Sequence, residues 1–270
     1  MNANLKNKVA IITGSSNGIG RQLAVELLSN EYIVILNGRT AERISKAKRE
    51  LEGKYPLVDS FAGDVSSYQC ANDLITFAEN KYGRIDLLVN NAGATMNSTL
   101  IETSPTVFQK IYETNVFGAN NMAIAALPAL RKSKGSIIFT SSLAGIHGLP
   151  RFSAYSSSKM ALRAIAESLR LEEVNTGVHV GLIYVGFTDN DPSKKCFNSS
   201  GELEPIANNT GFKTQSTDEV AKAILKNIER RQFITTLSSL GKLQMVLNRI
   251  SPNILRLIIQ KNYTKQLKKS

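Results

Sequence analysis

The feature that most constrains the fold is a glycine-rich turn between an apolar run and a helical pattern near the start of the chain. Residues 8–13 (KVAIIT) are apolar and β-branched, which predicts a buried strand, and residues 19–28 have the pattern of a helix. The turn between them contains Gly14, Gly18 and Gly20 in the spacing G-x-x-x-G-x-G. Glycines allow a tight turn and let the backbone approach a phosphate at the helix N-terminus, where free N–H groups attract anions. This context predicts a phosphate-binding turn, although a tight loop without a ligand would also need glycine.

Short apolar runs alternate with helical patterns through most of the remaining chain. Further strands are expected at residues 32–36, 57–62, 85–90, 136–140, 178–184 and 233–236. Further helices are expected at residues 41–51, 68–81, 105–130, 153–174 and 218–231, the last with Thr217 as its N-cap. This alternation predicts an α/β fold, a Rossmann-type doubly wound parallel sheet with helices on both faces, followed by a C-terminal helical tail.

The composition is that of an ordinary globular protein. The chain has 270 residues, 42% hydrophobic and 20% charged, which is enough for one large core. Cys70 and Cys196 are its only cysteines, which excludes a disulfide framework and favours a reducing, cytoplasmic setting. The sequence shows neither the apolar run of a signal peptide nor 18 consecutive apolar residues, so we expect no transmembrane helix. No His, Cys and Asp cluster has metal-ligand spacing, so we expect no metal.

The stretch from Ser142 to Lys159 holds three groups suited to proton transfer. Tyr155 and Lys159 are four residues apart, so on a helix their side chains lie on one face. A cation beside a phenol favours the phenolate, and we expect Lys159 to lower the pKa of Tyr155 from its reference of about 10. Tyr155 would then exchange a proton near neutral pH, and Ser142 would hydrogen-bond the oxygen whose charge changes. A surface Tyr–Lys pair is the plainer interpretation of this spacing alone.

The end of the second strand distinguishes between two dinucleotides. An acid there would bind the ribose 2′-hydroxyl of NAD, whereas an arginine suits the 2′-phosphate of NADP. The chain has Asn37-Gly38-Arg39 and no acid before Glu42. Arg39 therefore predicts NADP(H), and an ordinary solvated arginine is the alternative.

Taken together, these residues resemble the classical short-chain dehydrogenases/reductases over residues 1 to about 190. The matching elements, in the expected order and at similar spacing, are Thr13-Gly14-x-x-x-Gly18-Ile19-Gly20, Asn90-Asn91-Ala92-Gly93, Asn115, Ser142 and Tyr155-x-x-x-Lys159. The resemblance implies a catalytic domain over residues 1–237, in which residues 187–216 form a substrate loop. It also implies hydride transfer between a nicotinamide and a carbon that carries oxygen.

The resemblance assigns roles to individual residues. Tyr155 would be the general acid in reduction and the base in oxidation, and Lys159 would lower its pKa and hold the nicotinamide ribose. Ser142 would orient the substrate oxygen, and Asn115 would hold a water that connects Lys159 to solvent. The residues expected to bind the cofactor are Gly14, Ser16, Asn17, Gly18, Ile19 and Gly20 at the turn, Arg39, Asp64 and Val65 toward the adenosine, and Asn91, Ala92, Gly93, Tyr155, Lys159, Val185 and Thr188 along the rest of the cleft.

One departure from the family pattern follows the sixth strand. The family has Pro-Gly there and a threonine four residues beyond the glycine, whereas this chain has Val185-Gly186 and reaches Thr188 after two. Asn190 occupies the usual threonine place. Either Thr188 or Asn190 would hydrogen-bond the nicotinamide amide, and the Val185 N–H would lie near the ring.

The net charge of +11 is concentrated near the end of the chain. Residues 222–270 contain eleven Lys and Arg and one acid, Glu229, which is 11 − 1 = +10, whereas residues 1–221 carry 22 − 21 = +1. A neutral body with a basic extension is not typical of a nucleic-acid-binding domain, so we expect no nucleic-acid partner.

Residues 238–270 are expected to form a basic amphipathic extension. Apolar residues recur at helical spacing before Ser251-Pro252, which breaks the helix, and again after it. One interpretation is two helices that pack on the body or on a second subunit, with solvated lysines. The other is a peripheral anchor on the anionic inner face of a membrane, which would also deliver lipophilic substrates.

The sequence therefore predicts an NADP(H)-dependent oxidoreductase that interconverts a carbonyl and an alcohol on a lipophilic small molecule. The alternatives are a 3-oxoacyl-thioester reductase and, in a different class, a catalytically silent nucleotide-binding or membrane-recruited regulator. The habit of the family implies a homodimer or homotetramer through helices 105–130 and 153–174. His147 is expected to be a loop residue, with contact to substrate as the alternative, and His179 to be structural.

Overall fold

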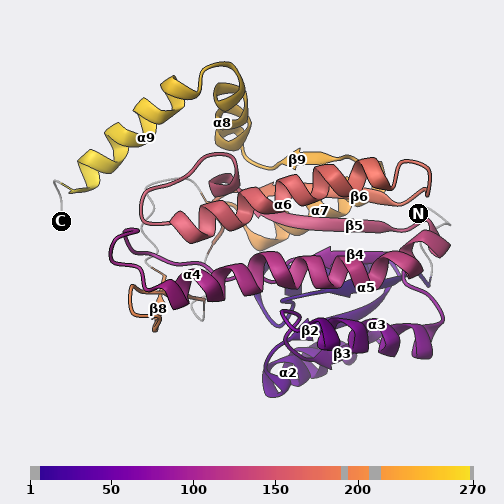
Figure 1. The fold of residues 1–270 in the computed structure, drawn as a ribbon. Helices are drawn as coiled ribbons and strands as arrows, with labels where there is room; N and C mark the ends of the chain where they lie inside the picture. The colour runs from indigo at the N-terminus through magenta and orange to yellow at the C-terminus, as the bar shows by residue number, and fades with distance from the viewer. Residues whose placement is uncertain (1–6, 190–193, 207–213, 268–270) are drawn as a thin grey trace.

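The computed structural model describes residues 7–189, 194–206 and 214–267 (Figure 1). Seven parallel strands form one sheet in the order β3-β2-β1-β4-β5-β6-β9. The chain winds outward from β1 in both directions, which is the doubly wound arrangement. The predicted Rossmann-type fold with a C-terminal helical segment is confirmed.

Short strands alternate with longer helices along the chain. The strands of the sheet are β1 (Val9–Ile12), β2 (Ile33–Gly38), β3 (Val58–Ala62), β4 (Leu87–Asn90), β5 (Ser136–Ser142), β6 (His179–Val185) and β9 (Ile234–Thr236). The helices are α1 (Gly18–Ser29), α2 (Ala41–Glu52), α3 (Tyr68–Tyr82), α4 (Pro105–Tyr112), α5 (Gly118–Ser133), α6 (Ser153–Glu172), α7 (Thr217–Arg230), α8 (Ser239–Ile250) and α9 (Pro252–Leu267).

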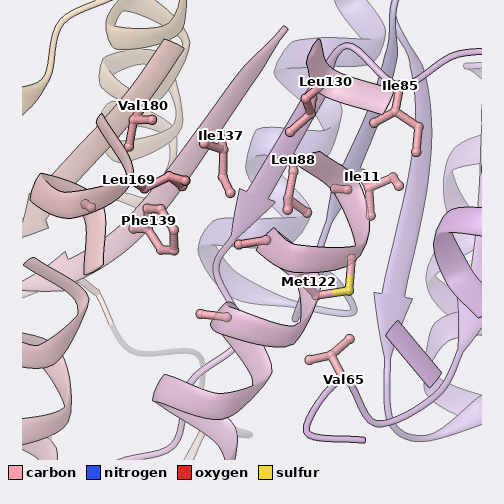
Figure 2. Close-up of a cluster of buried hydrophobic side chains, with 14 of the residues drawn as sticks. Ile11, Val65, Ile85, Leu88, Met122, Leu130, Ile137, Phe139, Leu169 and Val180 are labelled. Carbon is pink, nitrogen blue, oxygen red and sulfur yellow. The ribbon is translucent and has the colours of Figure 1, made fainter. Parts of the chain in front are cut away.

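Helices cover both faces of the sheet and bury two clusters of side chains. One cluster joins α3, α5 and α6 to the sheet through residues such as Ile11, Leu88 and Phe139 (Figure 2). The other joins α1, α2 and α7 to the opposite face through residues such as Leu23 and Ile224. Because the sheet is packed from both sides, the carboxyl ends of its strands are held at fixed positions along one edge.

The expected long helix over residues 105–130 is present, but it is not α-helical throughout. A π-helical turn, η1 (Glu113–Phe117), separates α4 from α5 and contains Asn115. A π turn widens the helix by one residue, and such turns occur frequently at functional sites. The sequence pattern does not reveal the π turn, because the apolar residues before it and those after it each follow helical spacing.

The expected N-cap of α7 is also wrong by one residue. The N-cap is Ser216 rather than Thr217. The Ser216 side chain accepts a hydrogen bond from the Glu219 N–H at 3.1 Å, and the Glu219 carboxylate accepts one from the Ser216 N–H at 3.0 Å. This reciprocal pair is a capping box, which satisfies two N–H groups at once and places the cap three residues before the glutamate.

The expected loop over residues 187–216 contains a two-stranded antiparallel hairpin, β7 (Lys195–Phe197) and β8 (Leu203–Pro205). The Phe197 N–H donates to the Thr95 carbonyl at 2.9 Å, and the Asn97 N–H donates to the Phe197 carbonyl at 3.0 Å. These bonds join the hairpin to the loop that follows β4. Strands of three residues are too short to produce a recognisable alternation in the sequence.

The C-terminal segment forms the two predicted helices, broken at Ser251-Pro252. α8 lies against the body, and α9 leads away from the sheet toward the C-terminus (Figure 1). Among the helices in the described ranges, none combines the length and the apolar character that crossing a bilayer requires.

An ion pair clamps α5 to α6, the helix that carries Tyr155 and Lys159. The Glu173 side chain is 1% exposed, and the Arg131 Nε donates to its carboxylate at 2.9 Å. The Arg131 guanidinium holds the pKa of Glu173 below its usual range. The neighbouring Lys132 lies 3.7 Å from Glu79 and is itself 79% exposed.

We expect Arg131→Leu to lower the melting temperature by several degrees at pH 7, because it leaves a buried carboxylate without its counter-ion. Lys132→Leu is the matched control, since a surface ion pair contributes little. Thermal unfolding followed by circular dichroism would compare them. Equal melting temperatures for the two variants would contradict the clamp.

Candidate active site

The glycine turn is pressed against the loop after β4. Gly14 has φ +63°, and a Cβ built on it would lie 2.7 Å from the Ala92 Cα. A Cβ on Gly20 would lie 2.6 Å from the Gly14 carbonyl oxygen. Neither position therefore accepts a side chain without displacement of backbone, which is why the sequence has glycine at both.

A hydroxyl that the sequence prediction did not single out as a site residue holds the turn in place. The Thr13 Oγ1 accepts hydrogen bonds from the N–H groups of Asn91 and Ala92, each at 3.0 Å. In return, the Asn91 amide donates to the carbonyls of Thr13 and Gly14, each at 3.0 Å. Asn91 and Ala92 thus fix the turn to the end of β4. A threonine at a strand end carries no sequence signal for this contact.

The N-terminus of α1 has room for an anionic group. Gly18 has φ +56°, and a Cβ built on it would meet nothing within 4 Å. The first turn of α1 contains no acidic residue, and its N-cap Asn17 is extended without a side-chain capping bond. Ser16 and Ile19 are half-buried beside this opening. The free N–H groups and the helix dipole therefore face open space, which fits the pyrophosphate of a dinucleotide.

The carboxyl end of β2 presents a cation and no carboxylate. Arg39 is exposed directly after the strand, and the first acid is Glu42 in α2. The Asn37 amide turns toward the end of β3, where it donates to the carbonyls of Phe61 and Gly63 at 3.1 and 3.2 Å. A 2′-phosphate here would meet the guanidinium of Arg39 without repulsion from an acid.

The turn after β3 is positioned by α5. Asp64 is exposed, and its carboxylate accepts a hydrogen bond from the Ser66 N–H at 3.0 Å. Val65 is buried, and its carbonyl accepts from the Asn121 amide at 3.2 Å. Asp64 and Val65, the two residues expected near an adenine ring, thus provide an exposed carboxylate and a backbone carbonyl held by a hydrogen bond.

Ser142, Tyr155 and Lys159 are brought together in the folded chain. Ser142 ends β5, and the other two lie in the first turns of α6. The Ser142 side chain lies close enough to the Tyr155 hydroxyl to lower the pKa of Tyr155. The Lys159 Nζ lies 5.9 Å from the centre of the Tyr155 ring. The predicted serine–tyrosine–lysine arrangement is therefore present at the carboxyl edge of the sheet.

The expectation that Lys159 lowers the pKa of Tyr155 is wrong for the protein as it stands. Burial raises the pKa of Tyr155, and the nearby Ser142 side chain offsets only part of that effect. The Lys159 ammonium donates instead to the Thr140 carbonyl at 2.8 Å. Burial, with the nearby charge of Lys194, lowers the pKa of Lys159 to about 8. The spacing of the two residues predicts their shared face but not this desolvation.

Asn115 holds the loop after β4 against α6. Its Oδ1 accepts from the Ala94 N–H at 2.7 Å, and its amide donates to the Ala94 carbonyl at 3.0 Å and to the Ser158 hydroxyl at 2.9 Å. A Cβ on Gly93 would lie 3.4 Å from both the Asn115 Oδ1 and the Lys159 Nζ. The π turn therefore places Asn115 near Lys159. Both side chains reach the position of Gly93, whose lack of a Cβ leaves room for them. Ser158 was not predicted from the sequence.

The segment after β6 lies beside the start of the C-terminal extension. Val185 is buried at the end of β6, and Thr188 forms a bridge with Gln215. A Cβ on Gly186 would lie 3.2 Å from the Ser238 Oγ. Asn190, the alternative to Thr188, lies outside the described residues.

The two histidines have structural surroundings. His179 is buried between the Ser136 hydroxyl and the Gln232 carbonyl, at 3.3 and 3.0 Å. The His147 Nδ1 lies 3.3 Å from the Asn248 Oδ1 of α8, a contact that the sequence did not predict. Within residues 7–189, 194–206 and 214–267, no three His, Cys, Asp or Glu side chains gather as a metal site.

Comparison with known proteins agrees with this geometry. The family model described as "short chain dehydrogenase" matches residues 8–201. The chain belongs to the short-chain dehydrogenase family. Two relatives are a "Dehydrogenase/reductase SDR family protein 7-like" of Drosophila melanogaster, 29% identical over 97% of this chain and 82% of that one, and a "3-ketodihydrosphingosine reductase" of Mus musculus, 32% identical over 86% and 71%.

Solved structures of short-chain dehydrogenases share the fold. An alcohol dehydrogenase from Thermococcus sibiricus complexed with 5-hydroxy-NADP is 25% identical, with a TM-score of 0.75 over 87% of this chain and 98% of that one. A family member from Burkholderia phymatum in complex with NAD is 20% identical, with a TM-score of 0.81 over 93% and 95%. Proteins of this fold thus bind either dinucleotide.

Lys159→Met is expected to stabilise the protein without cofactor at pH 7. A lysine whose pKa falls from 10.5 to about 8 on folding costs about 3 kcal/mol of stability at pH 7. Between pH 8 and 10.5 the unfolded chain binds more protons than the folded one, so the wild type gains stability as the pH rises. Its melting temperature should approach that of the variant over this range.

Thermal unfolding at several pH values would measure this difference. The control is Lys132→Met, because Lys132 is 79% exposed and its loss should leave the pH dependence unchanged. A constant difference between wild type and Lys159→Met from pH 7 to 10 would show that Lys159 folds with its ordinary pKa.

Proposed function

We propose that this short-chain dehydrogenase is an NADP(H)-dependent oxidoreductase that interconverts a carbonyl and an alcohol, with Tyr155 as general acid and base. The observation that carries the proposal is the position of the Tyr155 side chain, beside Ser142 and with its ring centre 5.9 Å from the buried ammonium of Lys159. These groups lie at the same sheet edge as the open N-terminus of α1. The proposed catalytic unit is residues 1–237.

The residues of this chain would have separate roles in cofactor binding, substrate binding and proton transfer. The turn from Gly14 to Gly20 and Arg39 would hold the pyrophosphate and 2′-phosphate, and the nicotinamide would supply the hydride. Ser142 would hold the substrate oxygen by a hydrogen bond. In reduction, the Tyr155 hydroxyl would give its proton to that oxygen, and in oxidation the phenolate would remove it.

Lys159 would bind the nicotinamide ribose in this scheme, since its buried ammonium lies at the end of β5, where it donates to the Thr140 carbonyl. A lysine with a pKa of about 8 carries its charge at neutral pH and is able to release a proton readily. Asn115, fixed by Ala94 and Ser158, would position the adjoining proton path to solvent.

A lipophilic keto compound is the proposed substrate class. The segments before Tyr155 and after β6 contain Leu149, Phe152, Phe187 and Phe197. The Phe152 ring lies 6.5 Å from the Tyr155 ring between centres, and Phe197 packs on the same small cluster as Tyr155. Relatives that are named 3-ketodihydrosphingosine reductase and 3-dehydrosphinganine reductase support a substrate of lipid character. A 3-oxoacyl thioester is the second candidate, since it also has a ketone at a third carbon.

Replacement of the tyrosine tests the proposed reaction. We expect Tyr155→Phe to reduce turnover with NADPH about 10² to 10⁴-fold, because the variant lacks the transferable proton. NADPH affinity, measured by fluorescence titration, should change little. The control is Tyr55→Phe, because the Tyr55 hydroxyl is hydrogen-bonded to Ser29 at the end of α1, away from the proposed catalytic residues.

The substrate panel should contain long-chain keto lipids, 3-oxoacyl thioesters and short ketones. Preference for the thioesters would select the second candidate. A wild type that binds NADPH and turns over none of these compounds would instead support a nucleotide-binding regulator. Equal turnover by wild type and Tyr155→Phe would remove Tyr155 from the chemistry.

The cofactor preference depends on Arg39. We expect the wild type to have a higher kcat/KM with NADPH than with NADH, and Arg39→Asp to shift this ratio at least about tenfold toward NADH. The reason is the loss of a charge-assisted hydrogen bond to the 2′-phosphate and the gain of an acceptor for a 2′-hydroxyl. Arg49→Asp, an equal charge change in the last turn of α2, is the control. Preference of the wild type for NADH would overturn this part of the proposal.

The assembly is proposed to be a homodimer or homotetramer through α5 and α6. These helices and the turn before α5 expose Phe117, Ile124 and Met160 at 53%, 49% and 38%. Exposed apolar residues on neighbouring helices are typical of subunit interfaces. Sedimentation of a monomer at micromolar concentration would contradict it.

A further inference from the structure

The helix α8 turns its polar and small residues toward the body. A Cβ on Gly241 would lie 2.7 Å from the Thr236 Cγ2, so the helix approaches the end of β9 closely. The Gln244 amide donates to the Leu143 carbonyl at 3.1 Å, and Asn248 contacts His147. Met245 adds one partly buried apolar contact. This inner face is therefore held largely by hydrogen bonds and close backbone approach.

The opposite face of α8 is apolar and exposed. Leu240, Leu243, Val246 and Ile250 are 42%, 56%, 52% and 77% exposed. Their spacing of three, three and four residues places them on one side of the helix. A surface helix ordinarily buries its apolar side and exposes its polar side, and α8 has the reverse arrangement.

The helix α9 continues this apolar surface. Leu255 is buried, and Ile259 and Tyr263 line a groove of about 450 Å³ between α9 and the start of α6. This is the side of α9 that faces the body. Ile254, Leu257 and Ile258 lie away from it and are 49%, 56% and 45% exposed.

Basic residues border the apolar surface. Lys242 and Arg249 are exposed on α8, and Lys261 and Lys265 extend the line of Ile254 and Ile258 toward the C-terminus at helical spacing. Over residues 238–270 the chain has seven Lys and Arg and no Asp or Glu, a charge of 7 − 0 = +7. We name the tail face as Leu240, Leu243, Val246, Ile250, Ile254, Leu257 and Ile258 together with these four cations.

The positive charge of the tail face indicates what kind of surface it binds. A second copy of the same face would bring cations against cations, which opposes a symmetric contact between two tails. An anionic lipid surface satisfies both features, because acyl chains accept the apolar side chains and head groups attract Lys and Arg. Since no described helix is suited to cross a bilayer, the two helices would lie in the interfacial plane.

We propose that the tail face docks the protein peripherally on an anionic membrane. The inference depends only on α8 and α9 and does not require the proposed reaction. If the reaction also holds, docking places the His147 loop and the adjoining α6, which carries Tyr155, next to the lipid-bound tail.

The test is flotation of the full-length protein with vesicles. We expect binding to phosphatidylcholine vesicles that contain about a third phosphatidylglycerol, and much weaker binding to pure phosphatidylcholine. Raising the salt from about 50 to 500 mM should reduce the bound fraction, because it screens the attraction between lysines and head groups.

Two pairs of variants separate the tail face from other exposed apolar residues. Leu243→Ser/Leu257→Ser should lower the partition coefficient at least about tenfold, since both side chains would enter the interface. Leu171→Ser/Val174→Ser is the matched control, because these residues at the end of α6 are 75% and 73% exposed and lie outside the tail. Lys261→Glu/Lys265→Glu should abolish the preference for anionic lipid.

Three outcomes would overturn the proposal. The first is absence of binding to anionic vesicles. The second is equal loss of binding in the Leu243/Leu257 variant and in the control variant. The third is that the wild type does not bind vesicles while the Leu243/Leu257 variant has a changed sedimentation coefficient. That result would assign the tail face to a contact between subunits.

Discussion

The parallel register of the central strands is the constraint on which the rest of the structure depends. β1, β4, β5 and β6 are neighbours and run in one direction, so their carboxyl ends meet at one edge. The pairing of Ile12 with Val89 and of Ser142 with Val185 fixes which residues meet there. Residues separated by more than a hundred positions in the chain thus come together at one edge of the sheet.

At this edge of the sheet, one hydroxyl and two side-chain amides hold the proposed functional segments in place. The Thr13 hydroxyl and the Asn91 amide connect the glycine turn to the loop after β4, and Asn115 connects that loop to α6. The π turn is what brings Asn115 to this position. The buried Lys159 is the costly member of the set, since its charge is held by one carbonyl and lies near Lys194. A buried charge with so little compensation is typical of functional sites.

The outer segments are joined to this centre by few contacts. Gly186 lies against Ser238, and His147 contacts Asn248, so the C-terminal extension borders both sides of the proposed substrate region. The hairpin β7–β8 reaches the same region through Phe197. The sheet edge would determine the type of reaction, whereas these surrounding segments would determine which molecule reaches it and where the protein resides.

The sequence alone determined the fold class and the order of elements, because periodicity and turn chemistry are local properties. The grouping of Gly14, Ser142, Tyr155 and Lys159 followed from the resemblance of its motifs to the short-chain dehydrogenases. It also determined the basic, amphipathic character of the last 33 residues. It did not determine the π turn, the Ser216 cap, the hairpin or the raised pKa of Tyr155. These depend on burial and on partners far along the chain, such as Ala94 and Ser158 for Asn115. Only the tertiary structure decided that α8 turns its polar side inward, because a helical pattern gives the two faces but not their direction.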